Sequence, residues 1–159
     1  VLTFTFKNYE GKIPVPGVID NQSQALLDKA QATLSVMDGL ISKCYFKDAI
    51  KAAMVLAQEA NRYLDQKAPW KTIKTDKEAA GTSLYVTISV LSCLRIIFYP
   101  FLPFSSARLH EYLGFSGNLQ DSGWNFVLPP AGQKLVTPQP LFAKLDEKRL
   151  EEENRRLEQ

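Results

Sequence analysis

The chain has 159 residues and a mass of 17.9 kDa, about the size of one ordinary domain. Its 19 lysines and arginines against 17 aspartates and glutamates leave a formal net charge of +2, which excludes a protein that coats duplex DNA as a histone does. Apolar residues make up 45% of the sequence, a share that is typical of globular proteins and not of disordered ones.

The sequence holds one histidine, His110, and two cysteines, Cys44 and Cys93, so a zinc site with four Cys and His ligands is excluded. Both cysteines have apolar neighbours and lie far apart in the chain. We expect two buried thiols in a reducing compartment, and therefore a cytoplasmic protein. A disulfide between them is the less favoured alternative.

Residues 1–9 allow two interpretations. Leu2, Phe4 and Phe6 alternate with threonines, and this period of two predicts a short strand. The alternative is the end of a helix that begins before Val1. The stretch 10–17 contains two glycines and two prolines, which continue neither a strand nor a helix.

Residues 20–44 and 47–66 have helical periodicity. In the first segment, apolar residues recur in steps of three and four from Leu26 to Cys44 and form one face. The second helix must end before Pro69, because a proline lacks the N–H group and restricts the residue ahead of it. The predicted buried face of this second helix comprises Ile50, Ala53, Met54, Ala57, Ala60 and Leu64.

A third long helix is predicted over residues 76–99. Thr75 and Glu78 have the spacing of a capping box, with Thr75 as the N-cap. The segment 84–104 is apolar on nearly every side, which is typical of a helix at the centre of a bundle. We do not expect it to cross a membrane, because Arg95 lies in its middle and a central charge costs about 2.5–3.5 kcal/mol there.

The C-terminal third begins with a shorter helix that Ser105 or Ser106 caps and that ends at Leu113, with Gly114 in the position after the C-cap. Residues 115–140 are rich in Gly, Pro, Asn and Ser and predict irregular coil.

Residues 141–145 are expected to hold this coil against the body. From Lys144 to Glu158, 11 of 15 residues are charged, and the i,i+4 pairs Glu151–Arg155 and Glu152–Arg156 favour a solvated helix. The sequence therefore predicts an all-α fold: an antiparallel helical bundle with an irregular C-terminal excursion and a charged helical tail.

Enzyme motifs do not occur in the sequence: we find no glycine-rich phosphate loop and no nucleophile elbow. His110 and Glu111 are adjacent on a predicted helix and point about 100° apart, so we interpret His110 as a surface or capping residue and not as an acid–base catalyst. Asp48, Glu59 and Asp65 lie on one helix at spacings that do not converge on a metal ion. We predict no catalytic residue, cofactor or metal site in this chain.

The sequence around Trp70 departs from that of an ordinary bundle. Trp70 follows Pro69 just beyond a predicted helix end. An aromatic ring among cations is typical of single-stranded RNA recognition, in which bases stack on the ring and lysines meet phosphates. The alternative, which composition alone favours, is that Trp70 packs into the bundle and the lysines are solvated. The cations are Arg62, Lys67, Lys71, Lys74 and Lys77, against Asp65 and Asp76.

The segment Asn61-Arg62-Tyr63…Ala68-Pro69-Trp70…Lys74 resembles the signature of the anticodon-binding helical bundle of methionyl-tRNA synthetases, a class I aminoacyl-tRNA synthetase family. Related synthetases for Leu, Ile and Val share parts of the pattern. The resemblance covers residues 1–146, and residues 147–159 are expected to be the charged tail. Further landmarks in the family's order are 6–14, Phe46-Lys-Asp-Ala, 91–103, Leu113-Gly114 and Pro140 to Asp146.

The resemblance implies that Trp70 stacks on the first anticodon base of methionine tRNA. It also implies that residues 1–9 are the remainder of a first helix truncated at its N-terminus, whose earlier part carries an Asn and an Arg that read that base. Tyr63 is expected to belong to the core. Asn61 and Arg62 are expected to position the helix end or to meet a phosphate of the tRNA. Asp65 is expected to disfavour wrong anticodons, and Pro69 to fix the backbone. Lys67, Lys71 and Lys74 are expected to attract RNA. Asn61 could equally form a helix-terminal hydrogen bond.

Catalysis in the family requires an ATP-binding domain with a His-Ile-Gly-His-type element, which a chain with one histidine cannot contain. We therefore expect this chain alone to be inactive and to act within a methionine–tRNA ligase. The implied partners are methionine tRNA and the catalytic domain that uses ATP, and we expect a monomer that does not bind membranes. The alternatives are the anticodon domain of a Leu, Ile or Val synthetase and a helical module that binds protein rather than RNA.

Overall fold

The structure of the chain, a computed structural model, describes residues 1–142 and 155–156. Its regular elements are all helical, and the described residues contain no strand, which confirms the predicted all-α class. Only an isolated bridge between Lys12 and Lys134 has β-type pairing. The elements are α1 (Leu2–Asn8), α2 (Asn21–Ser42), α3 (Phe46–Lys67), α4 (Pro69–Thr72), α5 (Lys77–Ile97), α6 (Pro103–Tyr112) and the 3₁₀ helix η1 (Leu119–Ser122).

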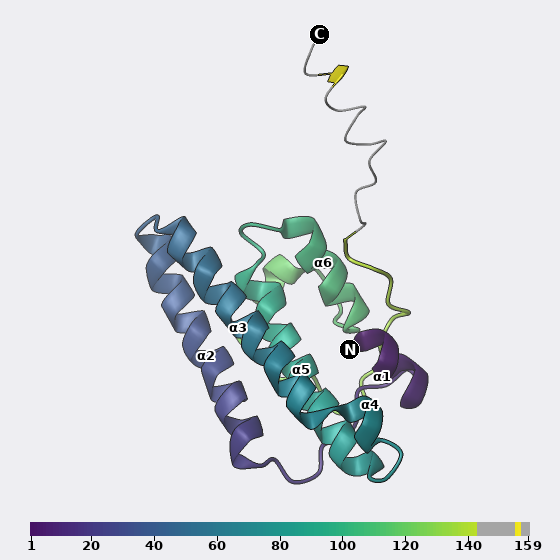
Figure 1. Ribbon diagram of the computed structural model, residues 1–159. Coiled ribbons are helices and arrows are strands. Elements are labelled where there is room, and N and C mark those ends of the chain that lie inside the picture. The colour runs from purple at the N-terminus through teal and green to yellow at the C-terminus, as the bar shows by residue number, and fades with distance from the viewer. Residues whose placement is uncertain (143–154, 157–159) are drawn as a thin grey trace.

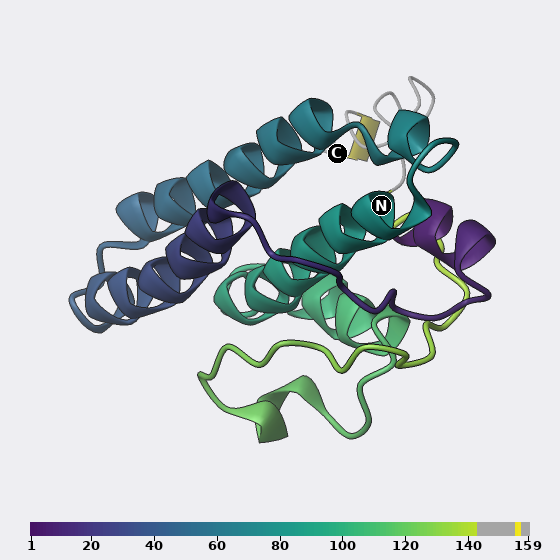
Figure 2. The same ribbon diagram turned by 90° about the horizontal axis from the view of Figure 1, so that it is seen from below.

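Three long helices form the body of the molecule. Helices α2 and α3 run antiparallel beside each other, and α5 packs against both (Figure 1). Seen from below, α4 and α1 lie at the end of the bundle where α3 ends and α5 begins (Figure 2). The predicted antiparallel bundle is therefore confirmed.

Helix α1 shows that the segment 1–9 is helical from Leu2 to Asn8 and is not a strand. The alternation of apolar residues and threonines is compatible with a helix, because Leu2 and Phe6 are four residues apart and therefore share one helical face. Both pack against a small core cluster that includes Ile13, Leu109 and Leu113.

Helix α2 buries the predicted apolar face and begins at Asp20, whose side chain accepts a hydrogen bond from the Ser23 N–H group at 2.8 Å. Cys44 does not continue this face: α2 ends at Ser42, and Cys44 is exposed in the turn with φ of 59°. The prediction of two buried thiols is therefore wrong for Cys44. Cys93 is buried, which raises the pKa of its thiol to about 12, and both cysteines are free.

Helix α3 faces α2 on one side and α5 on the other, so its buried arc is wider than a single stripe. Tyr63 belongs to this arc, as expected, and its hydroxyl forms a 2.7 Å hydrogen bond with the Ser23 hydroxyl. Ile50 and Met54 were predicted to be buried but are 40% and 48% exposed, because they lie beyond the edge of the arc. The buried residues are Ala49, Ala53, Leu56, Ala60, Tyr63 and Leu64.

Helix α5 begins at Lys77, one residue later than predicted. Asp76, not Thr75, is the N-cap, and its carboxylate accepts a hydrogen bond from the Ala79 N–H group at 2.9 Å. The predicted capping box is wrong because the Asp76 N–H group still donates to the Thr72 carbonyl at 2.7 Å, so Thr75 belongs to the turn that ends α4.

By length and composition α5 could cross a membrane, with a mean hydropathy of 1.5 in its most apolar window, but 89% of that window is buried inside the bundle. This burial confirms the prediction of a core helix. Arg95 lies on it with 1% of its surface exposed, and one guanidinium nitrogen is 2.6 Å from the Nδ1 atom of His110. The guanidinium also stacks 4.1 Å from the centre of the Phe115 ring.

His110 is therefore a buried core residue with 3% of its surface exposed, and its prediction as a surface or capping residue is wrong. Because a guanidinium can only donate, the Nδ1 atom of His110 accepts, and the imidazole is neutral. Burial and then the charge of Arg95 lower the pKa of His110. The same burial lowers the pKa of Arg95 to about 10.

Helix α6 begins with Pro103 at its first position after Leu102, and no side chain caps it, so the predicted caps Ser105 and Ser106 are wrong. A proline suits that position because its missing N–H group would have no partner in the helix. Gly114 follows the end of the helix with φ of 78°, as predicted. A Cβ atom there would lie 1.9 Å from the Lys134 carbonyl oxygen, so only glycine fits.

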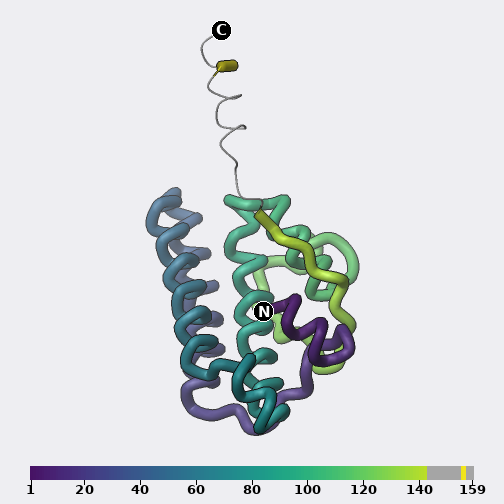
Figure 3. The backbone as a smooth tube through the Cα atoms, turned by 45° about the vertical axis from the view of Figure 1, so that its right-hand side comes forward, coloured from purple at the N-terminus to yellow at the C-terminus, as the bar shows by residue number. Residues whose placement is uncertain are grey.

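The predicted coil 115–140 contains one regular turn, the 3₁₀ helix η1, which Asn118 and Asp121 cap reciprocally. Trp124 packs against the main core and donates to the Leu34 carbonyl at 3.2 Å. The chain then returns beside α1 (Figure 3), where the Ile13 N–H group donates to the Gln133 carbonyl at 2.9 Å. Leu141 packs against the smaller cluster.

Apart from the exposed helical residues Arg155 and Arg156, the predicted charged tail lies outside the described residues. Residues 143–145, the rest of the segment expected to hold the coil, lie outside them too.

Candidate nucleic-acid interface

The candidate interface is the elbow formed by the end of α3, the helix α4 and the turn after it, which we define as residues 67–74. Helix α3 ends because Ala68 adopts a left-handed conformation, with φ of 41° and ψ of 57°. Pro69 then starts the four-residue helix α4 and is buried. The combination turns the chain sharply between α3 and α4 and places Trp70 at the second position of α4.

Trp70 is 43% exposed and belongs to neither core cluster, and its indole N–H group has no hydrogen-bond partner among the described residues. The other tryptophan, Trp124, behaves in the opposite way, because it is packed against the core and hydrogen-bonded. A half-exposed indole without a polar partner offers a flat face to a ligand.

Five cations of the segment differ in how they are used. Among the described residues, Lys71 and Lys74 are exposed and form no ion pair. Lys67 forms an ion pair with Asp20, and its ammonium lies 5.6 Å from the centre of the Tyr63 ring. The two remaining cations also have partners: Arg62 pairs with Glu59 at 3.2 Å and Lys77 lies over the Tyr9 ring at 5.4 Å.

The polar residues of α3 lie one to two turns before the elbow. Asn61 and Asp65 are exposed, and neither forms a side-chain hydrogen bond within the described residues. Asn61 and Arg62 are adjacent, so their side chains point about 100° apart and do not converge on one group. The structure thus brings Pro69, Trp70, Lys71 and Lys74 together at the elbow and leaves Asn61, Arg62 and Asp65 along α3.

A pocket of about 370 Å³ lies beside the elbow and did not follow from the sequence, because its walls come from segments distant in the chain. It holds three carboxylates, Asp20, Asp76 and Glu78, against one ammonium, Lys67. The hydrogen bonds from Lys67 and then from Ser23 lower the pKa of Asp20, so this carboxylate is ionised at neutral pH. The pocket therefore carries an excess of negative charge, and Lys71 and Lys74 do not line it.

A metal centre does not arise from this arrangement. Within residues 1–142 and 155–156, no group of three His, Cys, Asp or Glu side chains could hold a metal ion. The elbow offers two means of binding a ligand. Trp70 provides an aromatic surface for stacking, and the exposed ammonium groups of Lys71 and Lys74 attract anions.

Comparison with known proteins identifies the family. The profile of a family described as the anticodon binding domain of methionyl tRNA ligase matches residues 13–158. A methionine–tRNA ligase of Dehalococcoides mccartyi is 54% identical over 132 residues, which cover 83% of this chain and 24% of that protein. The corresponding ligase of Chloroflexus aurantiacus is 38% identical over 183 residues and covers 99% of this chain and 30% of that protein.

Solved structures agree. The apo form of Mycobacterium tuberculosis methionyl-tRNA synthetase superposes with a TM-score of 0.84 at 25% identity, covering 91% of this chain and 30% of that one. The chain spans about a quarter to a third of the length of these relatives. The fold and these matches lead to one conclusion: the chain belongs to the family of anticodon-binding domains of methionyl-tRNA ligases.

Proposed function

We propose that this chain binds the anticodon stem-loop of methionine tRNA, with Trp70 as the platform for an anticodon base. The observation that carries the proposal is the state of Trp70: half-exposed, outside both core clusters, and followed by the unpaired Lys71. Family membership supports the methionine type over the Leu, Ile and Val types.

Each predicted tRNA-binding residue has a role in this proposal. Stacking on Trp70 contributes about 1–3 kcal/mol per base, while Lys71 and Lys74 meet the phosphates. Pro69 anchors the platform from its buried position. Asn61, Arg62 and Asp65 form a polar rim along α3, where Asp65 disfavours wrong anticodons. Lys67 adds attraction only in part, because Asp20 compensates its charge.

Because the chain spans only part of its relatives, the activity of the whole protein is also a proposal. We infer that the rest of the protein is the catalytic domain, which attaches methionine to tRNA with ATP, and that the elbow selects the tRNA. In this view the chain binds no cofactor of its own, and residues 147–159 are a tail attached to the domain 1–146. We further propose that this chain by itself is a monomer and that the ligase acts in the cytoplasm of a bacterium, as its relatives are bacterial proteins.

The proposal is tested by replacing Trp70 with alanine and measuring affinity for a stem-loop RNA that carries the methionine anticodon. Loss of about 1–3 kcal/mol of stacking weakens binding by about 5- to 150-fold. Phe104→Ala is the matched control, since Phe104 is an exposed aromatic residue on α6 with 86% of its surface exposed. Unchanged affinity of Trp70→Ala would overturn the proposal.

A second candidate, a protein-contact module, is favoured by a different face of the molecule. An apolar groove of about 250 Å³ lies between α3, α5 and α6, and the exposed Met54 and Phe142 line it. Such a groove suits an apolar segment of another part of the ligase. This contact does not compete with the RNA proposal, because the groove and the elbow share no lining residue.

A further inference from the structure

The short helix that carries Trp70 cannot hold its own shape. Helix α4 has four residues, and one turn of helix is unfavourable in isolation because it fixes several dihedral angles for a single hydrogen bond. Trp70 is also outside both core clusters and 43% exposed, so packing covers only part of the indole and does not by itself fix its direction. Something else in the structure must hold the turn.

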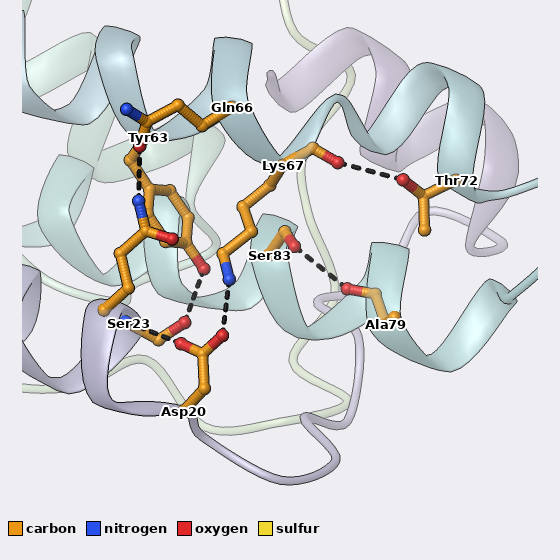
Figure 4. A network of polar contacts seen from close by, with 9 residues as sticks. Asp20, Ser23, Tyr63, Gln66, Lys67, Thr72, Ala79 and Ser83 are labelled. Atoms are coloured by element: carbon orange, nitrogen blue, oxygen red, sulfur yellow. Dashed lines mark hydrogen bonds and ion pairs between the residues drawn. The ribbon is translucent and has the colours of Figure 1, made fainter.

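The hydroxyl of Thr72 connects the end of α4 to the end of α3. It donates to the Lys67 carbonyl at 2.9 Å (Figure 4). It also lies 3.2 Å from the Ala68 carbonyl, at the end of α3. The N–H groups of Lys71 and Thr72 also point at the Ala68 carbonyl, at 2.8 and 3.1 Å. One threonine side chain thus joins the last carbonyls of α3 to the end of α4, with Trp70 between them.

The upstream side of this junction is tied to α2. The ammonium of Lys67 pairs with one oxygen of Asp20, while the other oxygen of Asp20 caps α2 through the Ser23 N–H group (Figure 4). The Ser23 hydroxyl contacts the Tyr63 hydroxyl one turn earlier on α3. The Lys67 carbonyl that Thr72 uses therefore belongs to a residue that is held at both its backbone and its side chain.

The downstream side is tied to α5. The Thr72 carbonyl accepts from the Asp76 N–H group at 2.7 Å and from the Thr75 hydroxyl at 3.2 Å, and Asp76 caps α5. Thr72 therefore lies at the point where the two ties meet. Its carbonyl binds the start of α5 and its hydroxyl binds the end of α3.

We propose that Thr72 is a positioning residue for Trp70: its hydroxyl holds the α3–α4 elbow so that the indole keeps one orientation before RNA arrives. The effect on RNA affinity rests on the proposed function. The effect of the Thr72 hydroxyl on the orientation of the indole does not depend on RNA. An oriented platform loses less freedom on binding than a mobile one, so affinity depends on the hydroxyl although it touches no RNA.

Thr72→Val tests the idea because valine keeps the branched shape and removes only the hydroxyl. We expect affinity for the methionine anticodon stem-loop to fall by about three- to tenfold. Thr72→Ser restores the hydroxyl and should restore the affinity. Thr33→Val is the matched control, since the Thr33 hydroxyl donates to the Lys29 carbonyl at 2.7 Å on α2, remote in sequence from the elbow.

A second readout needs no RNA. The chain has two tryptophans, so incorporation of 5-fluorotryptophan produces two fluorine resonances, which Trp70→Phe assigns. In Thr72→Val the Trp70 resonance should shift and change its line width, while that of Trp124 stays in place as a reference within the same sample. Thr72→Ser should return the Trp70 resonance to its original position.

The outcomes separate the two proposals. If the Trp70 resonance in Thr72→Val matches that of the unaltered chain, Thr72 does not position the indole and the inference is overturned. If the resonance moves and Trp70→Ala leaves RNA affinity unchanged, the positioning is supported and the proposed function fails. If Thr33→Val weakens RNA binding as much as Thr72→Val does, the effect is one of general stability and the inference is overturned.

Discussion

At the scale of single residues, the buried pair of Arg95 and His110 is the feature with the clearest consequence. Two basic residues meet in the core, and no carboxylate within the described residues pairs with either of them. The arrangement is tolerable because His110 is neutral and accepts from the guanidinium, while the Phe115 ring covers the charge.

This pair predicts a pH dependence of stability. The pKa of His110 is lowered in the folded state, so the unfolded chain binds the proton more readily. The contribution of neutral His110 to the free energy of unfolding should therefore be fully present above the ordinary pKa of 6.5. The free energy of unfolding should fall as the pH drops below that value. Urea unfolding between about pH 5 and pH 8 measures the effect.

The control is His110→Gln, which should flatten this part of the pH profile. Because the sequence has one histidine, its imidazole resonance can be followed without assignment. A folded-state pKa for His110 at or above 6.5 would contradict the prediction.

At the scale of secondary-structure elements, the start of α5 shows how a neighbouring turn decides between two possible caps. Thr75 and Asp76 are both good N-cap residues, and Thr75 has a glutamate at the capping-box position. The turn that ends α4 engages the Thr75 hydroxyl with the Thr72 carbonyl, and so Asp76 becomes the cap.

Replacement of each residue by alanine distinguishes the two caps. Asp76→Ala should lower the free energy of unfolding by about 1 kcal/mol because the Ala79 N–H group loses its partner. Thr75→Ala should change it by about 0.5 kcal/mol or less, as an exposed position outside the helix does. Urea unfolding of both variants measures the difference, and a larger loss for Thr75→Ala would restore the capping box.

At the scale of the whole molecule, the net charge of +2 hides a separation of charge. The free lysines Lys71 and Lys74 lie at the elbow, whereas the adjacent pocket has three carboxylates against one lysine. A small total charge is therefore compatible with the proposed local contact to an RNA loop, in which the phosphates would face the lysines and not the pocket.

This distribution predicts a modest dependence of RNA affinity on salt. Two phosphate contacts should produce a slope of about −1 to −2 in a plot of log affinity against log salt concentration. Replacing both lysines by glutamine should bring the slope towards zero. A slope near zero for the unaltered chain would favour the protein-contact candidate, since an apolar contact releases no counterions.

Much of the fold could be predicted from the sequence wherever residues close together in the chain determine the secondary structure. Three features act over a few residues: the periodic apolar residues of α2, the apolar sequence of α5 and the break at Pro69. Their patterns can be recognised without knowing which helices pack beside them. The resemblance around Asn61 to Trp70 identified the family for the same reason, because that segment is one continuous motif.

The position of each side chain relative to distant segments could not be predicted in this way. Ile50 and Met54 have the right spacing for burial, but the placement of α2 and α5 leaves them at the edge. His110 is buried because Arg95, fifteen residues earlier, lies across from it. The residues that hold Trp70 come from α2, α3, α4 and the start of α5.

The sequence by itself determined the long helices with their approximate limits, because each depends on interactions within a few residues, and the family, because its motif is one continuous segment. It also singled out Trp70 as the proposed platform. Only the tertiary structure decided which cations are free, which cap is used, and how the platform is held. Those outcomes depend on partners such as Asp20 for Lys67, which are distant in the chain and are brought together by packing of the helices.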